Sequence, residues 1–277
     1  MSERVNIPGL PERLHDIATK LVHYGFAIKL ETGIWTITYP EGDTSGHRQI
    51  AFWESDLAPG LLRLLRAEEE KRGDLYRYEQ FDQRWGSKVY GNTPGDTTIA
   101  AAGCGPTSLA IVLQYLMNNG SRPRESCQGI TPEETARYGA THGRVSGHGT
   151  AGDPMIRGIK AQWPEFDGSR VTLREAIDLL EEGKLIIFLC KGCSGYTRNR
   201  PLHRKADASY GGHYMVLAGV EGADDKDRIF YVVDPGRNEN RAMRWIRQDQ
   251  LQYHTGGFWW VYVKGEPADR VSTLGDQ

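Results

Sequence analysis

The chain lacks both an excess of charge of one sign and a long apolar run. Its 277 residues include 34 basic and 36 acidic residues, so the composition gives no electrostatic footprint for nucleic acid. No apolar run approaches the length of a transmembrane helix, which argues against a membrane partner. We therefore expect a globular protein that binds neither nucleic acid nor membrane.

Cysteine is scarce, and the first residues lack the pattern of a secretory signal. The chain has four cysteines, and residues 1–8 contain no basic segment followed by an apolar one. Four cysteines without such a signal are typical of reduced thiols in the cytoplasm. We expect a cytoplasmic protein, with any export following a route that needs no signal of this kind.

One of the cysteines stands in an unusual setting. Residues 101–113 read Ala-Ala-Gly-Cys-Gly-Pro-Thr-Ser-Leu-Ala-Ile-Val-Leu, which places Cys104 between two glycines at the start of an apolar helix. The glycines allow close approach of other backbone, and the helix N-terminus favours the thiolate form. This pattern predicts an activated cysteine. The alternative is a small buried residue that begins a core helix.

A base for such a thiol is predicted by a hairpin further along the chain. His213 begins an apolar run that ends at Val220, and a polar turn connects this run to a second one, residues 228–233. Two such runs form an antiparallel hairpin, in which the start of the first strand lies beside the end of the second. His213 and Asp234 are therefore expected at the same end, and Pro235 stops the second strand there. The alternative is that His213 is an ordinary surface histidine and that Asp234 is an aspartate that begins a turn.

A possible donor to an oxyanion precedes the cysteine helix. Residues 78–85 read Tyr-Glu-Gln-Phe-Asp-Gln-Arg-Trp, and the amide of Gln80 could face an oxyanion formed by thiolate attack on a carbonyl. The backbone N–H of Cys104 would be the second donor. Gln83 is the rival for the role of Gln80.

These blocks together resemble a known family. The order "Tyr-x-Gln-x-Asp-x-x-Trp", "Gly-Cys-Gly-Pro-Thr-Ser-Leu-Ala", "Gly-His-Tyr-Met-Val-Leu-x-Gly" and "Val-x-Asp-Pro-Gly" is similar to the bacteriocin-leader-processing (double-glycine-peptidase-like, C39-like) papain-clan cysteine peptidases. The similarity spans residues 76–265 and is greatest to the stand-alone branch, which has no attached transporter.

The resemblance implies a role for each of the four site residues. Cys104 would be the nucleophile, His213 the base, Asp234 the residue that orients the histidine, and Gln80 the oxyanion-hole donor. It also implies a peptide or protein substrate, hydrolysis through a thioester, and no cofactor or metal. Two stretches depart from the family pattern: residues 1–75, and the segment from Cys190 to Gly212.

The sequence predicts an α+β protein with two parts. Residues 1–75 are expected to form a small α-β-β-β-α domain, with helices at 11–23 and 57–71 and strands at 26–30, 34–39 and 49–53. This domain could recognise substrate or a protein partner. The charge run 68–74 reads as a solvated hinge, and residues 266–277 as a frayed tail.

Residues 76–265 are expected to adopt a papain-like fold, in which a helical half with the nucleophile helix packs on an antiparallel sheet. Further helices are predicted at 132–138 and 173–182, and strands at 184–189, 214–220, 229–233 and 258–264. His142 and His148, which flank a glycine-rich loop, read as solvated side chains.

Some alternatives remain open at this stage. Cys190 and Cys193 could bind zinc with Cys127 and His203, but a single Cys-x-x-Cys unit is a weak signal, and a redox-sensitive pair at a strand end is the favoured interpretation. The leading function is a cysteine peptidase that cleaves a peptide or isopeptide bond. A cell-wall or glutamine amidase of the same chemistry, used as a toxin or effector, is the runner-up. An inactive peptide-binding module is the alternative of another class.

Overall fold

A computed structural model describes residues 5–41, 49–119, 130–146, 149–190, 212–222, 228–236, 243–247 and 255–264. Its first part, residues 5–72, is called the N-terminal unit below. The elements of this unit follow in the order helix, three strands and helix. The elements are a 3-10 turn (Glu12–Leu14), α1 (His15–His23), β1 (Ala27–Glu31), β2 (Ile34–Thr38), β3 (Gln49–Phe52) and α2 (Glu54–Arg72).

The N-terminal unit has an apolar core of its own. Its three strands pair antiparallel in the order β1-β2-β3, and α1 and α2 pack together beside them. The buried side chains of this core all come from within the unit: Ile7, Leu10, Leu14, Ile17, Ala18, Leu21, Phe26, Ile28, Trp35, Ile37, Leu57, Leu61, Leu62 and Leu65. That residues 1–75 form a separate domain stays a prediction.

The second part of the chain is built on a six-stranded antiparallel sheet. Its strands are β6 (Phe166–Val171), β7 (Ile186–Cys190), β8 (His213–Glu221), β9 (Ile229–Val233), β10 (Met243–Arg247) and β11 (Thr255–Val263). They lie in the order β10-β9-β8-β7-β11-β6, so β11, the latest of these strands in the sequence, lies between β7 and β6. Each of the five pairings is antiparallel.

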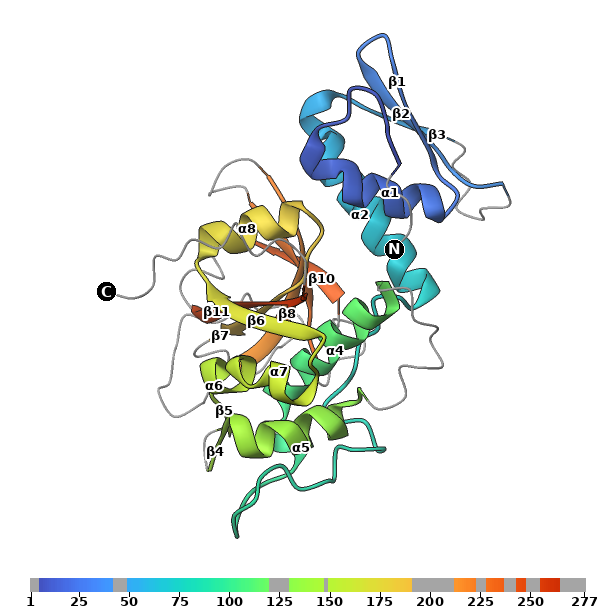
Figure 1. The fold of residues 1–277 in the computed structure, drawn as a ribbon. Coiled ribbons are helices and arrows are strands. Elements are labelled where there is room, and N and C mark those ends of the chain that lie inside the picture. The colour runs from blue at the N-terminus through green and yellow to red at the C-terminus, as the bar shows by residue number, and fades with distance from the viewer. Residues whose placement is uncertain are drawn as a thin grey trace.

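Helices cover both faces of this sheet (Figure 1). On one face lie α4 (Cys104–Asn119), α5 (Pro132–His142), α6 (Gly152–Arg157) and α7 (Ile159–Gln162). The other face is covered by α8 (Leu173–Glu181), whose first turn has a capping box between Thr172 and Glu175. Three short elements complete the described helices and strands: α3 (Ile99–Ala102) and the paired strands β4 (Arg144–Val145) and β5 (Gly149–Thr150).

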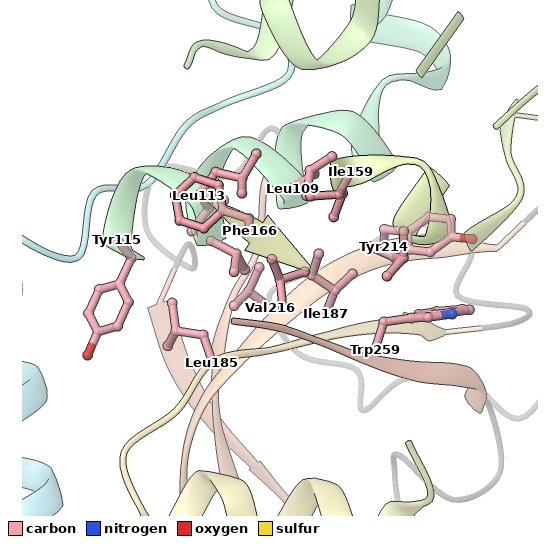
Figure 2. Close-up of a cluster of buried hydrophobic side chains, with 14 of the residues drawn as sticks. Leu109, Leu113, Tyr115, Ile159, Phe166, Leu185, Ile187, Tyr214, Val216 and Trp259 are labelled. Atoms are coloured by element: carbon pink, nitrogen blue, oxygen red, sulfur yellow. The ribbon is translucent and has the colours of Figure 1, made fainter. Parts of the chain in front are cut away.

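Alternation along the strands builds one apolar core on each face. Ile187 and Val216 face α4 and α7, where they pack with Leu109, Ile159 and others, as Figure 2 shows. Ile186, Phe188, Met215 and Leu217 face α8 instead. An antiparallel sheet with helices on both faces, and with the cysteine helix on one of them, agrees with the expected mixed α+β class.

Two strands of the sheet were not predicted. β6 has the sequence Phe-Asp-Gly-Ser-Arg-Val, and polar residues with a glycine in the middle give no strand pattern. β6 lies at one edge of the sheet and β10 at the other. Edge strands commonly carry charged and polar residues, which discourage pairing with another chain, so an apolar pattern does not mark them.

The prediction that residues 68–74 form a solvated hinge was wrong. Helix α2 continues to Arg72 and ends at Gly73, whose φ of 71° is the left-handed conformation that favours glycine. Within the run, the side chains of Glu68 and Glu69 are buried. The physical reason is that Glu69 has cationic and hydroxyl partners: Lys20 lies 3.6 Å away, the Tyr115 hydroxyl donates to it at 2.9 Å, and Arg66 forms a buried ion pair with it.

Arg66 connects α2 to three other elements of the second part. Its side chain is only 2% exposed. Nη1 donates to the hydroxyl of Tyr115 on α4 at 2.8 Å, and Nη2 to the carbonyl of Gly183, just after α8, at 2.7 Å. Nε donates to the carbonyl of Ala218, the residue at which the β8–β9 register shifts. A helix counted with the N-terminal unit is thus joined to the peptide backbone of the sheet.

His142 also departs from expectation. Its ring is half-buried and stacks on Tyr138, with centroids 4.3 Å apart and an interplanar angle of 18°. His148 lies outside the described residues. Among the helices that are described, none has the length and apolar character needed to cross a membrane.

Candidate active site

Cys104 is the first residue of α4, one residue after the short helix α3. The two glycines beside it are required by close packing. A Cβ on Gly103 would lie 2.5 Å from the carbonyl oxygen of Ile99, and one on Gly105 would lie 2.8 Å from the side chain of Thr150. The predicted close approach of backbone is confirmed at Gly103, whereas Gly105 leaves room for a side chain of the β4–β5 pair.

The predicted hairpin brings His213 and Asp234 together. Val216 of β8 pairs with Val233 of β9, so the register continues with Met215 opposite Asp234. His213 begins β8 two residues before Met215, so the pairing of the two strands brings it close to Asp234 at the same end of the hairpin. His213 Nε2 and Asp234 Oδ1 are 2.7 Å apart. The carboxylate oxygen Oδ1 also accepts the Gly236 N–H at 2.7 Å.

A second hydrogen bond joins the side chains of His213 and Cys104, and the backbone N–H groups of Tyr214 and Gly105 donate to the sulfur. Burial on its own raises the pKa of the Cys104 thiol. The hydrogen bond and charge of His213, with the two N–H donors, outweigh burial, and the pKa lies below the usual range of a cysteine. The position at a helix N-terminus acts in the same direction.

The pKa values of His213 and Asp234 are shifted in opposite directions. Burial alone lowers the pKa of His213, but the negative charges and hydrogen bonds of Asp234 and Cys104 raise it well above its usual range. Burial raises the pKa of Asp234, and His213, the Gly236 N–H and the charge of Arg77 together bring it below its usual range. The arrangement therefore favours a thiolate and an imidazolium ion side by side.

Gln80 lies beside both halves of the site. Its backbone N–H donates to the carbonyl of Pro235 at 2.9 Å, and its Nε2 donates to the carbonyl of Ala100, four residues before Cys104, at 2.7 Å. The side chain is buried, and its Oε1 has no hydrogen-bond partner among the described residues. Gln83, the rival for this role, is exposed. The structure thus brings Gln80 to the start of the cysteine helix and leaves Gln83 at the surface.

Three further residues line the surroundings of Cys104 and were not assigned to the site from the sequence. The Thr150 hydroxyl is 2.7 Å from the Tyr90 hydroxyl, and its carbonyl accepts from the Tyr214 hydroxyl at 3.0 Å. Burial raises the pKa of Tyr90 to about 12 and raises that of Tyr214 as well. Both phenols therefore stay neutral near the thiol. Tyr214 had a usable signal, because it directly follows the predicted base.

The expectation of four reduced cysteines is corrected at one position. Cys104 is a free thiol, whereas Cys190 at the end of β7 is disulfide-bonded. The other residues considered for zinc, Cys127, Cys193 and His203, lie outside the described residues. In the part of the chain that is described, no three or more side chains of His, Cys, Asp or Glu gather as a metal site would require.

Fold and site together define an α+β protein in which a cysteine at a helix start is hydrogen-bonded to a histidine and, through it, to an aspartate. The sequence matches the model of the Peptidase_C39-like family over residues 74–262, and the chain belongs to this family. The matched range contains all four predicted site residues. The N-terminal unit lies before it.

Other comparisons add context to this assignment. The chain is similar to a solved structure from Bacillus anthracis that is described as a C39-like peptidase, with 16% sequence identity and a TM-score of 0.38. That similarity covers 64% of this chain and 94% of the other. No curated protein matches the chain.

Proposed function

We propose that this protein is a papain-like cysteine peptidase that hydrolyses a peptide or isopeptide bond through a thioester on Cys104. The hydrogen-bonded chain from Cys104 through His213 to Asp234 carries the proposal. Such a chain supplies a nucleophile, a base and a group that orients the base, which is the constellation that thiol catalysis requires. Membership of the C39-like family supports the same function.

In the proposed reaction, the Cys104 thiolate attacks the carbonyl carbon and forms a tetrahedral oxyanion. Gln80 Nε2 and the Cys104 N–H donate to that oxyanion. The bond to Ala100 uses one of the two Nε2 hydrogens and fixes the amide plane, which leaves the other hydrogen for the oxyanion. His213 then gives its proton to the leaving amine, and the thioester remains. Water, deprotonated by His213, hydrolyses the thioester and restores the thiolate.

The proposal is tested by hydrolysis and by alkylation on the same set of variants. Wild-type protein is incubated with a library of internally quenched peptides, and iodoacetamide labelling of Cys104 is followed by mass spectrometry as a function of pH. We expect cleavage of a subset of peptides, and a labelling midpoint below the ordinary range of a thiol. Cys104→Ala should abolish both, while His213→Ala should move the midpoint above that range, because burial then acts on the thiol without its ion-pair partner.

Ser108→Ala is the matched control. Ser108 lies one turn along α4 from Cys104, is buried, and its hydroxyl has no hydrogen-bond partner among the described residues. Its removal should change neither the cleavage rate nor the labelling midpoint. Cleavage that survives Cys104→Ala would contradict the proposed function. A labelling midpoint that does not respond to His213→Ala would contradict the proposed ion pair.

A further inference from the structure

The segment between α2 and the cysteine helix runs alongside the turn that carries Asp234. Gln80 is tied to this turn through its backbone N–H, which donates to the carbonyl of Pro235. The turn is tight: a Cβ on Gly236 would lie 2.9 Å from Asp234 Oδ1. The position of the Asp234 carboxylate therefore depends on how residues 234–236 are held.

Arg77 holds this turn on both sides of the proline. Its Nε donates to the carbonyl of Asp234 at 2.8 Å, and its Nη2 to the carbonyl of Gly236 at 2.6 Å. Nη1 donates to Glu79 Oε1 at 2.7 Å, within its own segment. The Arg77 side chain is 11% exposed, so little water competes for these bonds. A planar guanidinium presents its donors in a fixed fork, which a lysine ammonium cannot do.

Both Arg77 and Gln80 therefore bind the turn at residues 234–236. The Arg77 fork holds the carbonyls on either side of Pro235, and the Gly236 N–H in the same turn holds the Asp234 carboxylate. Three residues after Arg77, Gln80 is bound to Pro235 and to Ala100 at the entrance to the cysteine helix. A change in the turn would move the orienting carboxylate and the amide of Gln80 together.

We propose that Arg77 is a positioning residue that locks the Asp234 turn to the Gln80 segment, and so fixes the partner of the histidine and the oxyanion donor as one unit. This role rests on the proposed function, because it acts through the groups assigned to catalysis. Asp234 is faced by His213 from β8, by the Gly236 N–H from its own turn, and by Arg77. His213 is faced in addition by Cys104 from α4.

Three variants test this role. Arg77→Met removes both the fork and the charge. Arg77→Lys keeps the charge but cannot bridge two carbonyls. Arg84→Met is the matched control, because Arg84 lies in the same stretch of chain and its ion pair with Asp82 is at the surface, with the arginine side chain 59% exposed. For each variant, kcat and KM are measured on a peptide cleaved by the wild type, and the pH dependence of Cys104 alkylation is recorded.

We expect Arg77→Met and Arg77→Lys to lower kcat by about 10- to 100-fold, the range found when a residue that orients a metal ligand is lost, with KM nearly unchanged. The alkylation midpoint should rise in both variants, because a displaced Asp234 no longer holds His213 as the imidazolium. Arg84→Met should match the wild type. Because Arg77→Lys keeps the positive charge, a loss of activity in this variant would be due to the lost bridge between the two carbonyls. If Arg77→Met does not fold, Arg77→Lys is sufficient for the test.

Two outcomes would overturn the role of Arg77. One is an unchanged midpoint and kcat in both Arg77 variants. The other is a loss of activity that follows only the folded fraction, measured by circular dichroism, with the midpoint unmoved. Failure of the proposed function looks different: the wild type would cleave no peptide. The alkylation midpoints would then still decide whether Arg77 positions the Cys104–His213 pair.

Discussion

Two arginines from earlier segments, Arg77 and Arg66, hold the β8–β9 hairpin at two different places, and the two places differ in their exposure to solvent. At the end with the candidate site, Arg77 binds the carbonyls around Pro235, and the His213 side chain stays 21% exposed. Toward the other end, Arg66 binds the carbonyl of Ala218 and an acid, Glu69, that is fully sealed from solvent.

The difference follows from what each end must do. A group that exchanges protons with a substrate and with water has to lie at a surface. An ion pair that only fixes how two parts of a protein fit together can be sealed, and its desolvation is offset by several hydrogen bonds. Changes near Arg66 should therefore affect stability, and changes at the His213 end should affect the rate.

The largest effect is expected from Arg66→Met. Removing one partner of a buried ion pair costs about 3–5 kcal/mol in the free energy of unfolding when the other charge is left without compensation. Lys20 stays 3.6 Å from Glu69, so the loss should lie at the lower end of this range. Urea unfolding followed by tryptophan fluorescence measures this. In the fraction that stays folded, the pH midpoint of Cys104 alkylation should match the wild type.

The double variant Arg66→Met with Glu69→Leu sharpens this prediction. Because it removes both charges, it should recover part of the lost stability. If Arg66→Met is as stable as the wild type, the junction between α2 and the sheet does not depend on this ion pair.

A smaller effect, on rate alone, is expected from Gln80→Ala. A donor to an oxyanion acts on charge that exists only in the transition state, so its loss should raise the barrier by about 2.7–4 kcal/mol and leave KM nearly unchanged. Cys104 should still react with iodoacetamide. Steady-state kinetics on a cleaved peptide measure the split between kcat and KM.

Gln83→Ala is the control for Gln80, because Gln83 is exposed in the same stretch of chain. It should keep wild-type kinetics. A loss of turnover in Gln83→Ala but not in Gln80→Ala would transfer the role of oxyanion donor to Gln83. If neither change affects turnover, backbone donors alone serve the oxyanion.

The smallest effect is expected from Arg63→Met. Arg63 pairs with Glu221 at the last residue of β8, one turn of α2 away from Arg66, but its side chain is 57% exposed. Exposed ion pairs contribute about 0–1 kcal/mol, and salt screens them. Urea unfolding at low and high salt should show a change no larger than this, and smaller at high salt. A loss as large as that of Arg66→Met would remove the distinction between sealed and exposed pairs on which the comparison rests.

The candidate site was largely predictable because its parts are local in sequence. Cys104 is marked by its flanking glycines and the helix start, and the pairing of His213 with Asp234 follows from hairpin geometry alone. The catalytic roles of these residues stay predictions, as does that of Gln80. Most of the helices and the central strands were predictable from apolar periodicity, which extends over several residues in each of them.

The roles of Arg66 and Arg77 could not be found in this way. Arg77 and Asp234 are 157 residues apart in sequence, and Arg66 and Ala218 are 152 apart. Both arginines bind backbone carbonyls, which every residue has, so the partner's sequence carries no mark of the contact. The charge run that reads as a solvated hinge is partly buried because the partners of Glu69 are also distant in sequence or unmarked: Lys20, Arg66 and the Tyr115 hydroxyl.

The place of β11 in the sheet affects the order in which the protein folds during synthesis. β6 pairs with β11, and β11 also pairs with β7, so the described sheet is interrupted between β7 and β6 until a strand from much later in the chain inserts. Pairings between residues so far apart in sequence form slowly, because a long loop must close first. During synthesis, Cys104, His213 and Asp234 all emerge before β11 does. The nucleophile and its partners are thus made ahead of the strand that completes their scaffold, and a nascent chain acquires its finished sheet only after β11 has been translated.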